Sequence, residues 1–279
     1  MLNGKSFITG HQGFLGKSFI ERVKPNAYLY NRNGLLSTLK SYNPEYIFHF
    51  AAEIYNEEDM FESNILLTYN LLEEARKLPN LKAFIYVGSS SEYGLKLKPM
   101  KETNYLDPSN MYEATKGAGT LLCQAYARNY NLPIVIARPF SLYGKYEPKH
   151  RFIPTIINCV RNKRTLNISP GVHDFIHIND FIDGLIMLTL KPQKGEIYNF
   201  GTGVQTSNKE LVELVESVMR KQTNKNFIEK LHTYDSDSWV ADISKAKKLG
   251  WKPKYNLEKG LVEVIQSTVF KSIFSHKGM

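Results

Sequence analysis

The first half of the chain alternates short apolar runs with longer stretches of helical periodicity. Five apolar runs predict buried strands: Lys5–Thr9, Ala27–Tyr30, Tyr46–Phe50, Ala83–Val87 and Ile134–Ala137. The stretches between them predict helices: Gly16–Val23, Leu35–Tyr42, Ile65–Leu78 and Met111–Tyr130. Short strands that alternate with helices indicate βαβ units, which build a parallel sheet covered on both faces.

After about residue 146 this alternation becomes less regular. One extended segment and five helices are predicted there: Phe175–Ile178, and Phe152–Arg161, Asn179–Thr189, Asn208–Arg220, Asp242–Gly250 and Leu257–Phe270. We predict an α/β fold, a Rossmann-type doubly wound parallel sheet with a smaller, mainly helical C-terminal substrate lobe. Residues 1–146 plus about 174–200 would form the dinucleotide-binding domain, and about 147–173 plus 201–279 the lobe. Ligands of such folds bind at the carboxyl edge of the sheet.

Composition narrows the class of protein. The chain has 279 residues, 42% of them hydrophobic, enough for a sizeable core without disulfides. Cys123 and Cys159 have no metal-ligand spacing, so we expect no metal site. The net charge of +9 allows nucleic-acid binding, but the cations are scattered, which favours an anionic small molecule. With no leader and no apolar run of about 18 residues, a cytoplasmic protein without a membrane partner is expected.

A glycine-rich turn follows the first predicted strand. Gly10, Gly13 and Gly16 stand three residues apart in Thr9–Gly16, TGHQGFLG. Gly10 would allow the tight turn, Gly13 the approach of backbone amides to a pyrophosphate, and Gly16 close helix–strand packing. The turn therefore predicts dinucleotide binding, with Gln12, Phe14 and Leu15 as further contacts.

The second predicted strand lacks the acid that an NAD site usually places at its end. Arg32 stands there instead, where a guanidinium could clamp a 2′-phosphate. NADP(H) is therefore favoured and NAD(H) remains possible, because Arg32 could also be plain surface.

A Tyr-x-x-x-Lys pair opens the long fourth helix. Tyr112 and Lys116 would share one helix face, where the ammonium is expected to lower the pKa of the phenol. Ser89 follows the fourth predicted strand and would face the same cleft. Such a set can bind a carbonyl, donate a proton to its oxygen and orient a hydride transfer.

In these features the sequence resembles the extended short-chain dehydrogenase/reductases that act on nucleotide sugars. The ordered matches are TGHQGFLG at 9–16, YIFHFAA at 46–52, Asn64, RPFSLYG at 138–144, GVHDFIHIND at 171–180, NFGTG at 199–203 and GWKP at 250–253. The resemblance implies that Ser89, Tyr112 and Lys116 are catalytic. It also implies that Ala51, Ala52, Lys116, Pro139 and Phe140 contact the cofactor.

Departures from the family pattern bear on the substrate. The 4,6-dehydratases of this family carry an acid one or two places after the catalytic Ser or Thr, where this chain has Ser90 and Ser91. Dehydration is therefore not expected, and both serines are assigned to substrate. Glu92 comes one place later and should point off the opposite face of the strand.

Two further departures fall at positions that normally face substrate. Ser141 replaces an Asn and His173 replaces an Arg of the family pattern. Arg151 is predicted to grip the substrate diphosphate in place of that missing Arg.

Three functions stay open at this point. The sequence motif GSSSEYG most resembles that of 4-keto-6-deoxy-sugar reductases, which favours an NADPH-dependent 4-ketoreductase of polysaccharide biosynthesis. The alternative is a C4 epimerase with retained NAD. A non-catalytic dinucleotide-sensing or RNA-contacting module would have no need of Ser89, Tyr112 and Lys116 together. We expect a nucleotide-sugar substrate, no nucleic acid and a homodimer.

Overall fold

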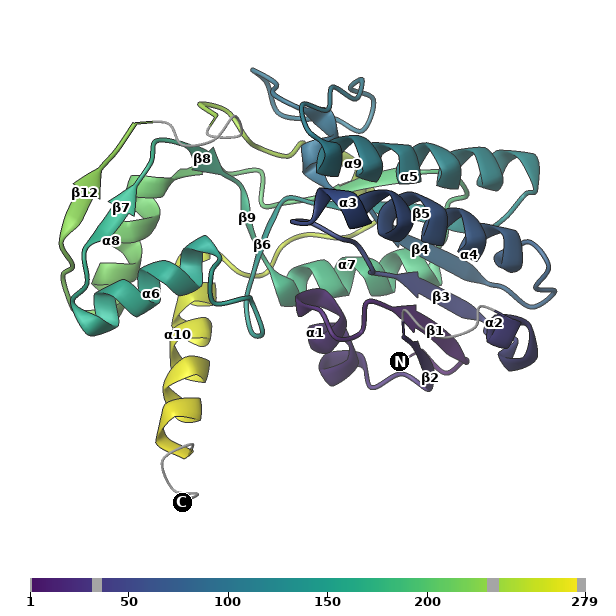
Figure 1. Ribbon diagram of the computed structural model, residues 1–279, viewed down its shortest axis with the longest axis horizontal. Helices are drawn as coiled ribbons and strands as arrows, with labels where there is room; N and C mark the ends of the chain where they lie inside the picture. Colours follow the sequence, from purple (N-terminus) through teal and green to yellow (C-terminus); the bar gives the residue numbers. More distant parts are fainter. Residues whose placement is uncertain (1, 32–36, 230–235, 275–279) are drawn as a thin grey trace.

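A computed structural model describes residues 2–31, 37–229 and 236–274 of the chain (Figure 1). Its central sheet has six strands in the order β10-β5-β4-β3-β1-β2. Their bounds are β1 Ser6–Thr9, β2 Ala27–Tyr30, β3 Tyr46–His49, β4 Ala83–Val87, β5 Ile134–Pro139 and β10 Ile197–Phe200. Every neighbouring pair is parallel, so all six carboxyl ends meet at one edge. The predicted α/β, Rossmann-type fold is confirmed.

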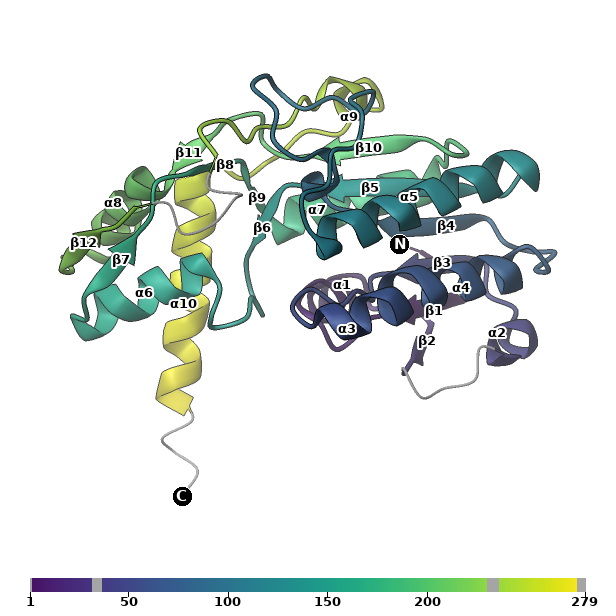
Figure 2. The same ribbon diagram turned by 45° about the horizontal axis from the view of Figure 1, so that its top comes forward.

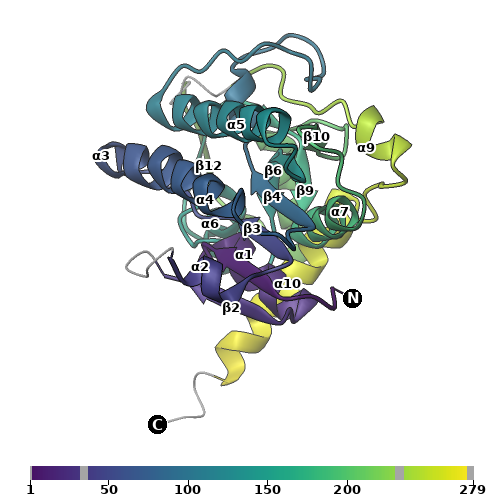
Figure 3. The ribbon, with the colours of Figure 1, turned by 90° about the vertical axis from the view of Figure 1, so that its right-hand side faces the viewer.

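Helices cover both faces of the sheet (Figure 3). On one face, Ile8, Phe48 and Ile85 pack with residues of α1 Phe14–Val23 and α7 Ile178–Leu190. On the other, their strand neighbours Phe7, Ile47 and Phe84 pack with α2, α4 and α5. These three helices span Ser37–Tyr42, Leu67–Ala75 and Met111–Asn129. Successive residues face opposite sides of a strand, so an unbroken apolar run lets each strand feed both cores.

The helix predicted at Ile65–Leu78 begins earlier in the structure. It starts at α3 Glu57–Met60, passes through a π-helical turn Phe61–Leu66 and continues as α4. The acidic residues at its start, which suit a helix N-terminus, hid it from a search for apolar periodicity. The buried Asn64 in the π turn accepts from Glu53 N at 2.7 Å and donates to Thr115 Oγ1 at 3.0 Å, which ties α5 to the loop after β3.

The C-terminal lobe is built from helices and short strand pairs (Figure 2). Its helices are α6 Phe152–Asn162, α8 Asn208–Met219 and α10 Leu257–Phe274. Its strands pair as β6 Ser141–Tyr143 with β9 Phe175–His177, β7 Leu166–Ile168 with β12 Lys225–Phe227, and β8 Val172–His173 with β11 Thr206–Ser207. Apart from the segment around β9, none of these strands was expected. A strand of two or three residues is too short to show an alternation of apolar and polar positions.

The proposed division of the chain, residues 1–146 plus about 174–200 against about 147–173 plus 201–279, stays a prediction. One segment within the second group packs elsewhere: Trp239, Ala246 and Trp251 lie in the core under the sheet, and α9 Ser244–Lys248 lies against β10. Among the described residues, no helix is long and apolar enough to cross a membrane.

Candidate active site

The glycine turn joins β1 to α1 at the carboxyl edge of the sheet. Gly10 has φ +68°, and a Cβ there would lie 2.5 Å from Ala51 N. A Cβ on Gly16 would lie 2.3 Å from Gly10 O, so α1 can sit this close to the turn only with glycine at both positions. Gly13 caps α1 and leaves the first amides of that helix facing the open edge, an arrangement that suits an anion.

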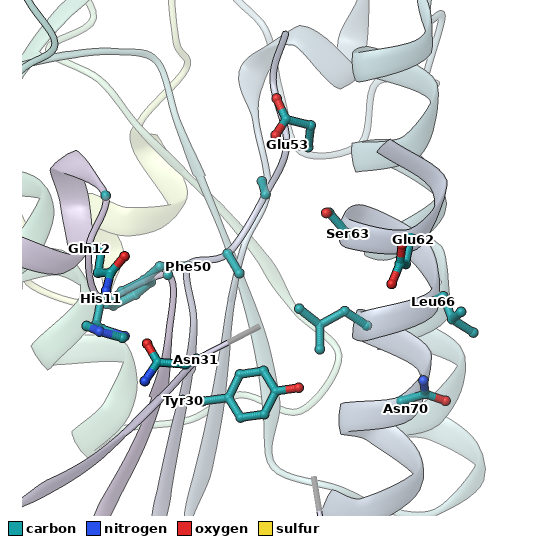
Figure 4. A pocket seen from close by; sticks show the side chains of 15 residues that line it. His11, Gln12, Tyr30, Asn31, Phe50, Glu53, Glu62, Ser63, Leu66 and Asn70 are labelled. Carbon is teal, nitrogen blue, oxygen red and sulfur yellow. The ribbon is translucent and has the colours of Figure 1, made fainter. Parts of the chain in front are cut away.

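A cavity of about 400 Å³ opens beside this turn (Figure 4). Gly10, Gln12, Gly13, Ala51 and Ala52, all predicted cofactor contacts, line it. Its other lining residues are His11, Tyr30, Asn31, Phe50, Glu53, Glu62, Ser63, Leu66, Leu67 and Asn70. Those from the π turn and α4 were not singled out from the sequence, and the predicted helix began only at Ile65, after Glu62 and Ser63. The lining includes two acids and, among the described residues, no Lys or Arg.

Other predicted cofactor residues lie around the cavity and do not line it. Phe14, Leu15 and Gly16 form the start of α1. Pro139 ends β5 and Phe140 follows it, next to β4 on the same edge. Arg32 lies outside the described residues.

The serine predicted to be catalytic caps a short turn. Ser89 precedes the 3₁₀ turn Ser90–Tyr93, and its Oγ accepts from Ser91 N at 3.2 Å. The Ser89 and Ser91 hydroxyls lie 2.6 Å apart, and the Ser89 side chain lowers the pKa of Tyr112. Ser89 and Tyr112, two of the three predicted catalytic residues, therefore lie close enough for one to influence the other's pKa.

Lys116 lies one helical turn after Tyr112 on α5, and its predicted catalytic and cofactor contacts stay predictions. Its Nζ donates to Val87 O at 2.7 Å and lies 4.6 Å from the centre of the Tyr86 ring. Burial lowers the pKa of Lys116 to about 8. Burial also raises the pKa of Tyr112, and the Ser89 side chain offsets this only in part. The direction is opposite to the expected one, because desolvation outweighs nearby charge. Tyr112 is thus a protonated phenol at neutral pH, able to donate.

The turn after Ser89 directs its next side chains into the protein. Ser90 is 6% exposed and its Oγ accepts from Trp239 Nε1 at 3.3 Å. Its predicted contact with substrate stays a prediction, as does that of the half-buried Ser91. Glu92 is fully buried against Arg138, so it points away from the cleft as predicted.

Ser141 and His173, the two residues that differ from the family pattern at positions facing substrate, lie together. Ser141 Oγ and His173 Nδ1 are 3.3 Å apart, on β6 and at the end of β8. No sequence signal linked them, since they are 32 positions apart.

Arg151 reaches toward the sheet side. Its guanidinium lies 6.0 Å from the centre of the Phe14 ring, and its charge lowers the pKa of Tyr112. Arg151 Nε also lies 3.4 Å from Glu147 Oε1. Burial raises the pKa of Glu147 to about 7, although Arg151 opposes the shift. A second contact joins the segment before α6 to the sheet side: Tyr55 Oη and His150 Nε2 lie 2.8 Å apart.

A Rossmann sheet, a glycine turn over a cavity, and a serine that lowers the pKa of a tyrosine are together typical of a dinucleotide-binding enzyme. The model of the NAD dependent epimerase/dehydratase family matches residues 6–201, more than half of the chain. The chain therefore belongs to this family of enzymes, which depend on a nicotinamide dinucleotide.

Three relatives illustrate the similarity. The chain is 27% identical to the low-salt glycan biosynthesis protein Agl12 of Haloferax volcanii, covering 91% of this chain and 95% of that protein. It is 29% identical to a dTDP-glucose 4,6-dehydratase of Haemophilus influenzae, covering 86% and 80%. It is 32% identical to an uncharacterized UDP-glucose epimerase, YtcB, of Bacillus subtilis, covering 72% and 65%.

Solved structures support the same fold. A UDP-glucuronic acid 4-epimerase of Bacillus cereus, in complex with UDP-glucuronic acid and NAD, superposes with a TM-score of 0.86 at 25% identity, covering 96% of this chain and 99% of that one. RMD of Pseudomonas aeruginosa, complexed with NADPH, superposes with a TM-score of 0.85 at 20% identity, covering 96% and 100%.

Proposed function

We propose that the chain reduces the 4-keto group of a nucleotide-activated 6-deoxy-hexose, with NADPH as the hydride donor. One observation carries this proposal: the residues that follow Ser89 on the turn offer only hydroxyls, since the carboxylate of Glu92 is buried against Arg138. Removing water from a sugar requires a further acid and base near C5 and C6, and this turn offers none. Reduction needs one proton and one hydride at a single carbon.

The glycine turn fits a dinucleotide, because Gly10 and Gly16 leave no room for side chains where the backbone must be exposed. Gly10, Gln12 and Gly13 would hold the pyrophosphate, with Ala51 and Ala52 along the cavity wall. The bound cofactor supplies the hydride. Tyr112 donates a proton to the carbonyl oxygen, and Ser89 holds that oxygen by a hydrogen bond.

The choice of NADPH rests on the sequence around Arg32. Neither Tyr30 nor Asn31, at the end of β2, supplies the carboxylate that would accept from a ribose 2′-hydroxyl. The nucleotide-sugar substrate rests on what the relatives act on by name, and on Arg151, Ser141 and His173 as its proposed contacts. A cytoplasmic location and a homodimer both stay predictions. Light scattering would test the homodimer.

A second candidate is a C4 epimerase that retains NAD. Two observations favour it: the absence of Lys and Arg among the described lining residues of the cavity, and the similarity to the epimerase structure that holds NAD. The same Ser89 and Tyr112 would serve both directions of proton transfer.

One experiment separates the candidates. A panel of nucleotide sugars and their 4-keto-6-deoxy derivatives is incubated with NADPH or NAD, and absorbance and product NMR are followed. A reductase consumes added NADPH in proportion to product, whereas an epimerase inverts C4 without net consumption. Formation of a 4-keto-6-deoxy sugar from its parent would refute both.

A further inference from the structure

The fully buried carboxylate of Glu92 makes three hydrogen bonds and one further ion-pair contact inside the protein. Oε1 accepts from Ser89 N at 2.7 Å. Oε2 accepts from Arg138 Nε and from Thr120 Oγ1, each at 2.8 Å, and forms an ion pair with Arg138 Nη2 at 2.7 Å. These partners come from three segments: the end of β4, the middle of α5 and the end of β5.

Each of those segments also carries part of the candidate site. Ser89 is itself the serine proposed to hold the carbonyl oxygen, and Thr120 lies one helical turn after Lys116 on α5. Arg138 directly precedes Pro139. A single carboxylate therefore fixes the relative positions of the three segments that must meet around the reacting carbon.

The surrounding backbone closes tightly over this carboxylate. A Cβ on Gly88 would lie 2.4 Å from Glu92 Oε1, so a larger residue at this position would have to displace the carboxylate. Arg138 is 1% exposed and its guanidinium carbon lies 4.5 Å from the centre of the Tyr93 ring. Tyr93 Oη in turn donates to Asn199 Oδ1 on β10 at 2.8 Å. Both side chains of the Glu92–Arg138 pair are therefore enclosed within the protein.

A buried ion pair is weak evidence for stability, because desolvation of both charges can exceed their attraction. The contacts of Glu92 instead suggest a role in geometry. Resting on the proposed function of Ser89 and Tyr112, we propose that Glu92 and Arg138 are positioning residues, which hold the Ser89 amide so that its hydroxyl meets Tyr112.

The charge of Glu92 also reaches the site. It raises the pKa of Tyr112 and that of Lys116. From other elements, Ser89 and Arg151 lower the pKa of Tyr112 and Tyr55 raises it. Removing the negative charge alone should therefore make Tyr112 easier to ionise.

Two substitutions separate geometry from charge. Glu92→Asp keeps the charge but is too short to reach Ser89 N, so kcat should fall at least about tenfold with KM and cofactor affinity unchanged; misplacements of about 1 Å cost up to about 100-fold. Glu92→Gln removes the charge, so the ionisation of Tyr112 should move to lower pH.

The chain offers a matched control in the lobe. Glu216 is 2% exposed, and accepts from Lys225 Nζ at 2.6 Å and from Thr223 N at 2.8 Å. Glu216→Gln should lower the melting temperature while kcat stays at the wild-type value.

Tyr112 can be followed without turnover, by ¹³C NMR of ring-labelled tyrosine assigned with Tyr112→Phe. We expect a lower titration midpoint in Glu92→Gln and the wild-type midpoint in Glu92→Asp and Glu216→Gln. If Glu92→Gln does not fold, Glu92→Gln/Arg138→Met leaves no unpaired buried charge and should show the same lower midpoint.

The two proposals fail in different ways. A wild-type protein inactive on the whole sugar panel refutes the proposed function, and the NMR comparison still stands. Equal kcat and equal Tyr112 midpoints in the Glu92 variants and in Glu216→Gln would overturn the positioning role.

Discussion

The two sides of the candidate active site are built in different ways. On the sheet side, Ser89 and Tyr112 stand at the ends of regular elements, and the buried Glu92 holds the serine in place. On the lobe side, Ser141 and His173 are half-buried and lie on strands of two or three residues. Proton transfer requires groups held in a fixed geometry, whereas a rim of short strands accepts substitutions. We infer that the sheet side determines the chemistry and the lobe side the choice of substrate.

Tyr112→Phe tests the sheet side and should have the largest effect. Loss of the donated proton should reduce kcat at least about 100-fold, the scale of general acid catalysis. Affinity for the cofactor, measured by fluorescence titration, should not change. Tyr105→Phe, at an exposed position, is the control and should turn over normally. Near-normal kcat in Tyr112→Phe would remove this residue from the mechanism.

Glu147→Gln tests whether the buried carboxyl group of Glu147, on the lobe side, destabilises the fold when it ionises. Its pKa of about 7 in the fold lies above its ordinary value of 4.5. The stability that the protonated group contributes is complete below pH 4.5 and is lost as the pH rises toward 7. At 1.36 kcal/mol per pKa unit the loss is about 3 kcal/mol for a side chain so well buried.

The variant should therefore melt at a higher temperature than the wild type at pH 8 and not at pH 4.5. The exposed Glu213→Gln in the same lobe should show no such difference. The same melting shift at both pH values would rule out ionisation as the cause.

Arg151→Ala asks whether the lobe side binds the substrate diphosphate. Loss of one charge-assisted hydrogen bond should raise the substrate KM or Kd by a factor that corresponds to roughly 1.5–3 kcal/mol, with NADPH affinity unchanged. Arg161→Ala on the same helix is the control. Unchanged substrate affinity would leave Lys145 or Lys149 as the phosphate partner.

Arg32→Asp concerns the cofactor and should have the smallest effect. An aspartate would repel a 2′-phosphate and accept from a 2′-hydroxyl, so the preference for NADPH should flatten or invert by about tenfold, or 1.4 kcal/mol. Titration of the wild type with NADPH and NADH provides the reference. Tighter binding of NADH by the wild type would show that the absence of an acid at the end of β2 does not favour NADPH.

The sequence also predicted the sheet side and the lobe side of the molecule to different extents. The strands that end at Thr9, Tyr30 and Val87 were predicted to within a residue, because unbroken apolar runs mark strands buried on both faces. β10 was missed, since Asn199 interrupts its run with a polar side chain that is fully buried and bonds Met100 O. A partner 99 positions away leaves no local pattern.

At the site, local motifs were informative and side-chain directions were not. Ser89 and Tyr112 were predicted from their spacing after a strand and at a helix start, and the structure brings them together. The bond from Lys116 to Val87 O and the contact of Ser141 with His173 depend on packing between distant segments. No spacing rule encodes such packing.

The central claim is that this chain delivers a hydride to C4 and removes no water. It is tested most directly with NADPH carrying deuterium at the transferred position and a nucleotide 4-keto-6-deoxy-hexose, with product NMR. We predict one deuterium at C4 for each NADPH consumed, and no 4-keto-6-deoxy product from the parent nucleotide hexose. Dehydration of the parent sugar, or product without deuterium at C4, would contradict the account.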